Sequence, residues 1–257
     1  MRAARDVESR RRASRTLPPA KPKANPRIEN PTVTLRPLLI LLFATITTFA
    51  AGAALSASAA DRDAALIGAA ERGDVASVQR LLAAGARVNA RDAQGRTALL
   101  AATYANRVEA ARVLIAAGAD VNAKDDMANS AFLLAGARGY LEILRLTLGA
   151  GADLASTNRF GGTALIPACH YGHVETVREL LGTKIHVDHV NNLGWTALLE
   201  AVILGDGGPA HVEIVRMLVA AGAKVNLADR EGVTPLQHAK GRGYREIAAI
   251  LERAGGR

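Results

Sequence analysis

The stretch LLAAGARVNARDAQGRTALLAA, residues 81–102, decides the fold because the chain repeats it. Related stretches follow later in the chain: LIAAGADVNAKDDMANSAFLLA (114–135), LLGTKIHVDHVNNLGWTALLEA (180–201) and LVAAGAKVNLADREGVTPLQHA (218–239). One polar residue marks the same point in four successive copies, spaced by 33 residues: Asp92, Asp125, Asn158 and Asn191. A constant period of this length predicts stacked supersecondary units rather than a single globular core.

Each copy predicts two short helices. Thr97 precedes an apolar segment and can cap a first helix, and in the last copy Thr234 is followed by Pro235, which suits the first helical position. A second helix is predicted from Val108, with apolar residues at helical spacing, up to Gly118, where a left-handed residue is favoured. One such pair is too thin to bury its own faces, so stacking is required.

These copies resemble the ankyrin repeat, whose signature combines G-x-T-P-L-x-x-A-A, G-H-x-E-V-V-x-L-L and G-A-D-V-N. The resemblance implies an all-α solenoid of about six helix-turn-helix repeats with short β-hairpin-like fingers. We number the repeats one to six, with these ranges: 61–91, 92–124, 125–157, 158–190, 191–228 and 229–257. The first and last are atypical and polar, as the exposed ends of a solenoid should be.

Four residues depart from the repeat pattern. Asn106 and Ala128 stand where turn glycines are expected, and Lys184 stands where repeat two has Gly118. Asn tolerates left-handed backbone better than Ala or Lys does. Pro167 falls inside the first helix of repeat four, where only an early-turn position tolerates proline. We therefore expect repeats three and four to be the least regular and the least stable locally.

Repeat five contains a five-residue insertion between its two helices, within GDGGPAH (205–211). Loop closure depends weakly on length, so an extended turn is the favoured interpretation. A ligand-binding loop is the alternative, since glycine-rich turns before helices can bind anions. The phosphate reading lacks a following Lys-Ser/Thr and a preceding strand.

The positive charge of the chain is concentrated at its start. Residues 1–60 contain ten Lys and Arg against three acids, which leaves residues 61–257 nearly neutral and argues against nucleic-acid binding. A basic, proline-rich stretch (1–36), predicted to be disordered or to precede the true start, is followed by an apolar run (37–60) typical of a cleavable signal peptide. We therefore expect a periplasmic protein, with an uncleaved inner-membrane anchor or secretion as alternatives and no other membrane contact.

Repeat four also contains a cluster of residue types that bind metals or act as nucleophiles: Cys169, His170, His173, His186, Asp188 and His189. The repeat pattern places Cys169 in the core, which disfavours a thiolate, and spreads the others over different faces. The sequence also lacks the common hydrolase and nucleotide-binding motifs. We predict no cofactor, no metal and no enzymatic activity, with a metal- or small-molecule-dependent activity at repeat four and the 205–211 loop as the alternative.

The resemblance to ankyrin repeats implies that finger tips and inner-helix surfaces line a concave protein-binding face. Carried over by position, the candidate residues are Tyr104, Met127, Arg138, Arg159, Phe160, His170, Tyr171, Leu193, Trp195, Arg230 and Arg242. Trp, Tyr and Arg are common interface anchors, so we expect the region of Phe160, Tyr171 and Trp195 to anchor a protein partner. The protein itself is expected to be a monomer, and a secreted effector acting on a host protein is a further alternative.

Overall fold

The computed structural model describes residues 58–257, and the predicted basic stretch and most of the apolar run lie outside this part. The described residues form six helix pairs: α2 (Ala59–Arg72) with α3 (Val75–Ala83), α4 (Ala98–Tyr104) with α5 (Val108–Ala116), α6 (Ala131–Arg138) with α7 (Leu141–Gly149), α8 (Leu165–His170) with α9 (Val174–Leu181), α10 (Ala197–Ile203) with α11 (Pro209–Ala220), and α12 (Pro235–Gly241) with α13 (Arg245–Arg253). Within residues 58–257, none of these helices is long and apolar enough to cross a bilayer.

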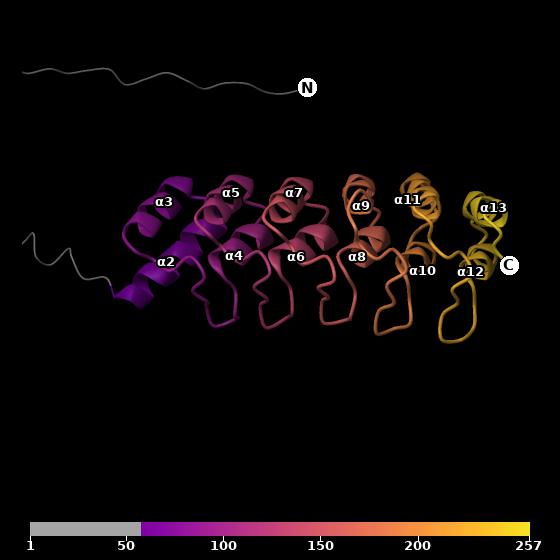
Figure 1. The fold of residues 1–257 in the computed structure, drawn as a ribbon, viewed down its shortest axis with the longest axis horizontal. Coiled ribbons are helices and arrows are strands. Elements are labelled where there is room, and N and C mark those ends of the chain that lie inside the picture. Colours follow the sequence, from indigo (N-terminus) through magenta and orange to yellow (C-terminus); the bar gives the residue numbers. More distant parts are fainter. Residues whose placement is uncertain (1–57) are drawn as a thin grey trace, which may run out of the picture. The chain divides into compact units, whose positions relative to one another are not determined.

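The helices form two parallel rows, and a loop projects from the solenoid between successive pairs (Figure 1). We call the even-numbered helices inner, the others outer, and the projecting loops fingers. This arrangement confirms the predicted all-α repeat solenoid. The predicted fingers are present, and residues 58–257 contain no strand. Each finger is instead a turn closed by a backbone bond, such as Asp92 N–H to the Arg96 carbonyl at 3.0 Å.

The inner helices begin where the sequence predicted. The hydroxyl of Thr97 accepts a hydrogen bond from the Leu100 N–H, and Thr234 forms a full capping box with Gln237. Apolar side chains from both rows meet in one continuous core, in which Phe132 and Leu144 are fully buried. The core therefore continues from repeat to repeat, as a stacked array requires.

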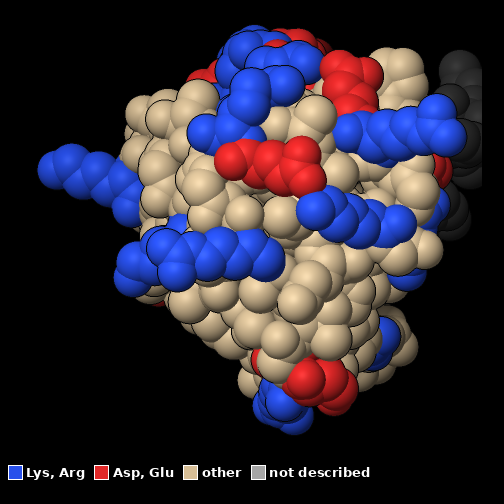
Figure 2. Space-filling model, turned by 90° about the vertical axis from the view of Figure 1, so that its right-hand side faces the viewer, with Lys and Arg blue, Asp and Glu red and all other residues tan. Residues whose placement is uncertain are grey.

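The C-terminal end is capped by polar side chains. Figure 2 faces this end and shows Lys and Arg side chains projecting around it, with Asp and Glu among them. Lys240 of α12 forms an ion pair with Glu252 of α13 at 2.7 Å. Polar side chains of this kind keep the exposed end of a solenoid hydrated.

Pro167 makes the first helix of repeat four irregular, as expected. Because proline has no N–H, the Thr163 carbonyl accepts from Ile166 N–H at 3.3 Å instead of from residue 167. The Thr163 hydroxyl is left buried without a hydrogen-bond partner, whereas the hydroxyl at the corresponding position caps the inner helix in the other finger-bearing repeats. Helix α8 consequently starts one residue later, with Pro167 in its first turn.

The expected strain at Lys184 does not occur, so that expectation was wrong. Lys184 is not among the residues with positive φ. The Thr183 hydroxyl donates to the Leu180 carbonyl at 2.6 Å and accepts from the Ile185 N–H at 3.2 Å. In repeat two the corresponding Ala119 N–H bonds directly to the Leu114 carbonyl. The Thr183 side chain thus closes the end of α9 without a left-handed residue.

Asparagine bridges join successive repeats at three interfaces. The Asn122 side chain, for example, accepts from the Asp153 N–H at 2.8 Å and donates to the Gly151 carbonyl at 3.2 Å. Asn89 and Asn226 bond in the same way. Repeat three has Ala155 at this position, so the interface between repeats three and four lacks the bridge. The lower local stability of these repeats stays a prediction.

Ala128 adopts the left-handed backbone that its position requires, with φ of 59°. We expect Ala128→Gly to raise the free energy of unfolding by about 0.5–1 kcal/mol, because Ala pays a steric cost there that glycine avoids. Urea denaturation of the two proteins measures the difference. Gly161 is the matched site in repeat four, where a Cβ would lie 2.4 Å from Asn192 Oδ1, and Gly161→Ala should destabilise. A loss of stability in Ala128→Gly would contradict the strain argument.

Candidate functional site

A groove of about 930 Å³ lies along the fingers and inner helices of repeats three to five. Its walls come from the fingers that begin at Asp125, Asn158 and Asn191 and from helices α6, α8 and α10. Eight of the eleven predicted site residues line it: Tyr104, Met127, Arg138, Arg159, Phe160, His170, Tyr171 and Leu193. The structure thus brings most of the predicted residues to one place.

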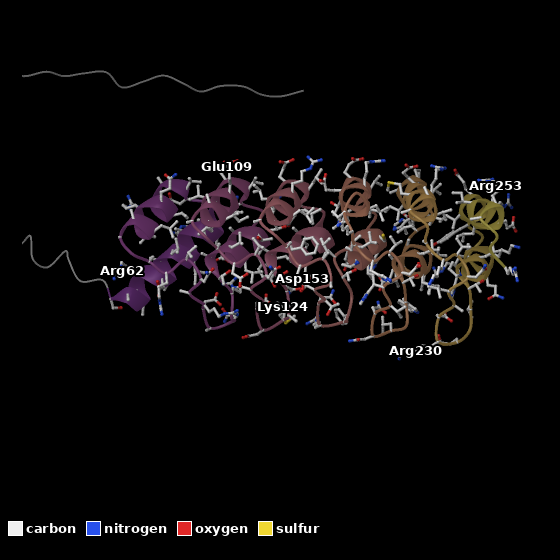
Figure 3. The ribbon with its side chains drawn as sticks, viewed as in Figure 1. Arg62, Glu109, Lys124, Asp153, Arg230 and Arg253 are labelled. Atoms are coloured by element: carbon white, nitrogen blue, oxygen red, sulfur yellow. The ribbon has the colours of Figure 1, made fainter. Side chains whose placement is uncertain are left out.

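The other three predicted residues lie outside the groove. Trp195 is half-buried in its finger and is not part of the lining. Arg230 lies on the last finger (Figure 3), where its guanidinium donates to the Asn192 carbonyl at 2.6 Å. The Arg242 guanidinium lies 6.0 Å from the centre of the Tyr244 ring. The geometry therefore favours Phe160, Tyr171 and Leu193 over Trp195 as the centre of the site.

Exposed apolar side chains concentrate in this groove. Six large hydrophobic residues are exposed in the described part of the chain, and five line the groove: Met127, Phe160, Tyr171, Leu193 and Leu204. The sixth is Val190. A contiguous exposed apolar surface marks an interaction site more strongly than single exposed hydrophobic residues do.

The finger tips are held by hydrogen bonds from the first residue of each finger. The Asn158 side-chain oxygen accepts from the backbone N–H groups of Phe160 and Gly162 at 2.9 and 3.1 Å. The side-chain oxygens of Asp125 and Asn191 accept the same two backbone hydrogen bonds in the fingers that carry Met127 and Leu193. The exposed side chains thus stand on ordered turns, which lowers the entropy lost when a ligand binds them.

Aromatic and cationic groups stack along the groove. The Arg159 guanidinium lies 4.7 Å from the centre of the Phe160 ring and contacts the Met127 sulfur at 3.4 Å. The rings of His170 and Tyr171 stack with centroids 4.2 Å apart and planes 12° apart. Tyr104 is fixed by two side-chain hydrogen bonds, since its hydroxyl donates to Asp125 Oδ2 at 2.6 Å and accepts from the Asn129 amide.

Glu200 lines the groove but was not among the predicted site residues. Its side chain is only 8% exposed, and Oε2 lies 3.6 Å from His170 Nδ1. The Asn191 amide donates to Oε1 at 3.0 Å, but burial dominates and raises the Glu200 pKa to about 7. Burial also lowers the His170 pKa, with a smaller contribution from the nearby charge of His211. A perturbed carboxyl group in a groove is a common feature of functional sites.

The alternative site in repeat four finds little geometric support. Cys169 is fully buried, which raises its thiol pKa far above the usual range and disfavours the reactive thiolate. Within residues 58–257, no three His, Cys, Asp or Glu side chains converge as metal ligands would. The histidines make other contacts, and His189 Nε2 lies 2.7 Å from the Gly161 carbonyl oxygen.

The insertion in repeat five is partly a turn and partly helix. Helix α11 has 12 residues and begins at Pro209, so its first turn comes from the inserted region. The remaining turn is held by His211, whose Nδ1 lies 2.8 Å from Asp206 Oδ1 and whose Nε2 lies 2.9 Å from the His170 carbonyl oxygen. The Tyr244 hydroxyl donates to the Gly205 carbonyl at 2.9 Å. The predicted extended turn is therefore shorter than expected, because the end of the insertion forms the first turn of α11.

The two rows of short helices, the fingers and the groove define an open helical-repeat solenoid. A family model described as "Ankyrin repeats (3 copies)" matches residues 42–125 and 132–229. The chain belongs to the ankyrin-repeat family. The first match extends into the predicted apolar segment, which the structure does not describe.

Similar proteins come from several sources. The chain is 57% identical to a crystallised ankyrin repeat domain from Acinetobacter baumannii AYE, with a TM-score of 0.73, covering 75% of this chain and 98% of that one. It is 38% identical to the ankyrin repeat protein EF0377, with a TM-score of 0.72 and coverage of 74% and 98%. It is 29% identical to the ankyrin repeat domain of Bcl-3, a member of the IkappaB family, with a TM-score of 0.68 and coverage of 75% and 86%.

One curated relative is the putative ankyrin repeat protein YahD of Escherichia coli K12, which is 46% identical over 56 residues. That match covers 22% of this chain and spans only 28% of the length of YahD. These relatives establish the fold and the family.

Proposed function

We propose that this chain is a non-enzymatic binding module that holds a protein partner in the groove of repeats three to five. Ankyrin repeats generally serve as protein-protein interaction modules. The observation that carries the proposal is the gathering of five of the six exposed large hydrophobic residues of the described chain along one groove. Burial of these side chains against a partner would provide the main favourable free energy.

The rest of the described surface offers a weaker candidate. The outer helices carry Glu and Arg side chains that pair with each other, such as Arg145 with Glu142 and Glu179. Glu109 lies on this outer side, far from the finger that carries Arg230 (Figure 3). A surface whose charges already pair with each other offers a partner less favourable binding free energy than an exposed apolar groove does.

We further propose that the protein is exported to the periplasm, because its basic start precedes an apolar run that ends in small residues. Helix α2 begins at Ala59 and is capped by Ser58, so cleavage after Ala59 or Ala60 would remove this cap. Cell fractionation with N-terminal sequencing tests the proposal. A cytosolic protein that keeps its first residues would refute it.

The binding proposal is tested by crosslinking in cells and capture through a C-terminal tag on the full chain. We expect one dominant partner that Phe160→Ala/Tyr171→Ala loses, because both side chains are exposed and their removal spares the core. Val190→Ala is the matched control, since Val190 is equally exposed but lies outside the groove. A partner that the double variant retains and Val190→Ala loses would place the binding face elsewhere.

A further inference from the structure

The fixed charges of the groove are positive. Two arginines, Arg138 and Arg159, line it, and Glu200 is the only carboxylate among the lining residues. Glu200 is nearly inaccessible, and burial favours its uncharged form. Burial likewise lowers the pKa of His170 and His173, so both histidines favour the neutral state. The arginines therefore dominate the potential that an approaching ligand meets.

These two arginines have no acidic partner among residues 58–257. The Arg138 side chain forms no ion pair or hydrogen bond with another described residue, and the Arg159 guanidinium has the Phe160 ring and the Met127 sulfur as its partners. The outer helices differ, because Arg145, Arg178 and Arg216 each pair with a Glu on their own helix and another on the next outer helix. The groove thus keeps guanidinium groups available where the outer row neutralises them.

Apolar and cationic side chains lie side by side in the groove. Phe160 lies exposed beside the Arg159 guanidinium, Tyr171 lies exposed against the His170 ring, and Leu193 stands at the next finger tip. The N–H groups of an arginine lie in the plane of its guanidinium. An arginine that already stacks on an aromatic ring can therefore still donate these N–H groups to a carboxylate. The same groove can therefore hold an apolar side chain and an acidic one.

We propose that the groove binds an extended protein segment in which a bulky apolar side chain lies next to one or more carboxylates. The apolar side chain packs among Phe160, Tyr171 and Leu193, and the carboxylates pair with Arg138 and Arg159. This inference rests on the proposed function, and it adds the chemical class of the partner. A polyanion such as a nucleic acid fits less well, because two guanidinium groups neutralise few phosphates and the groove is largely apolar.

The test selects displayed random peptides of about twelve residues on the full chain and measures the affinity of the enriched peptides. We expect enrichment of Asp and Glu beside Leu, Ile, Met or an aromatic residue. Arg138→Gln/Arg159→Gln should weaken these peptides by about tenfold or more, because each lost pair removes a charge-assisted contact. Arg112→Gln, a matched change on outer helix α5, should leave the affinity within about twofold.

The outcomes separate this inference from the proposed function. Enriched peptides that need Phe160 and Tyr171 but carry no acidic residues, or ignore both arginines, would overturn the charge inference alone. Peptides that bind equally to the Phe160→Ala/Tyr171→Ala variant, or no enriched peptide, would overturn both proposals. A single-stranded oligonucleotide of similar length that binds as tightly as the acidic peptides would also refute the assignment to a protein segment.

Discussion

Replacing His211 with alanine should lower the free energy of unfolding by about 2–4 kcal/mol, since it removes a buried ring and two polar contacts. The ring lies between two glycines, and a Cβ on Gly205 would come within 2.5 Å of its Cδ2 atom. Its loss would leave a cavity and free the His170 carbonyl, which now lies 2.9 Å from Nε2. Urea denaturation at neutral pH measures the change.

His186→Ala is the control for this substitution, because His186 is an exposed histidine and one of the candidate metal ligands of repeat four. We expect its stability to stay within about 0.5 kcal/mol of the parent protein. If both variants lost the same free energy of unfolding and added zinc restored it, the metal alternative would be favoured over the structural role. A His211→Ala protein of unchanged stability would show that the insertion is not held by this ring.

The fold could be predicted because repetition tests each assignment several times. Thr97 alone is weak evidence for a cap, but Thr or Ser recurs at this position, and the side chain forms the cap in every finger-bearing repeat except repeat four. The local exceptions were harder. Nothing in the pattern shows that the Thr183 hydroxyl replaces the left-handed residue, because that bond depends on the side-chain rotamer. The extension of α11 into the insertion also depends on tertiary packing of His211 and Tyr244.

The site could be predicted where the position of a residue in the repeat determines which way its side chain faces. Residues at the finger tips, such as Met127, Phe160 and Leu193, face the groove because the turn geometry recurs. Trp195 was carried over by position like the others, but it lies outside the lining, although Asn129 and Gly162 at the same register line the groove. Glu200 had a signal that was overlooked: the same register holds Ala101, Leu134, Pro167 and His238 in the other finger-bearing repeats. The single carboxylate at that register distinguishes repeat five from the other repeats.

Glu200→Gln should make the protein more stable at pH 8, by about 1–2 kcal/mol, and should have little effect near pH 4.5. Burial raises the Glu200 pKa from its ordinary value of 4.5 to about 7, so the folded protein holds this proton more tightly than the unfolded chain does. The resulting stabilisation is fully present below about 4.5 and is lost as the pH rises through 7. Glutamine is uncharged at every pH and can still accept the Asn191 hydrogen bond.

Denaturation curves of both proteins at pH 8 and pH 4.5 test the sign, with the exposed Glu175→Gln as the control for loss of charge alone. An equal gain at both pH values would mean that shape, rather than buried charge, sets the difference. A gain in stability confined to high pH would mean that the chain carries a destabilising carboxylate in the lining of its groove. Natural proteins keep such costs mostly where function requires them, so that result would favour a role for Glu200 in binding.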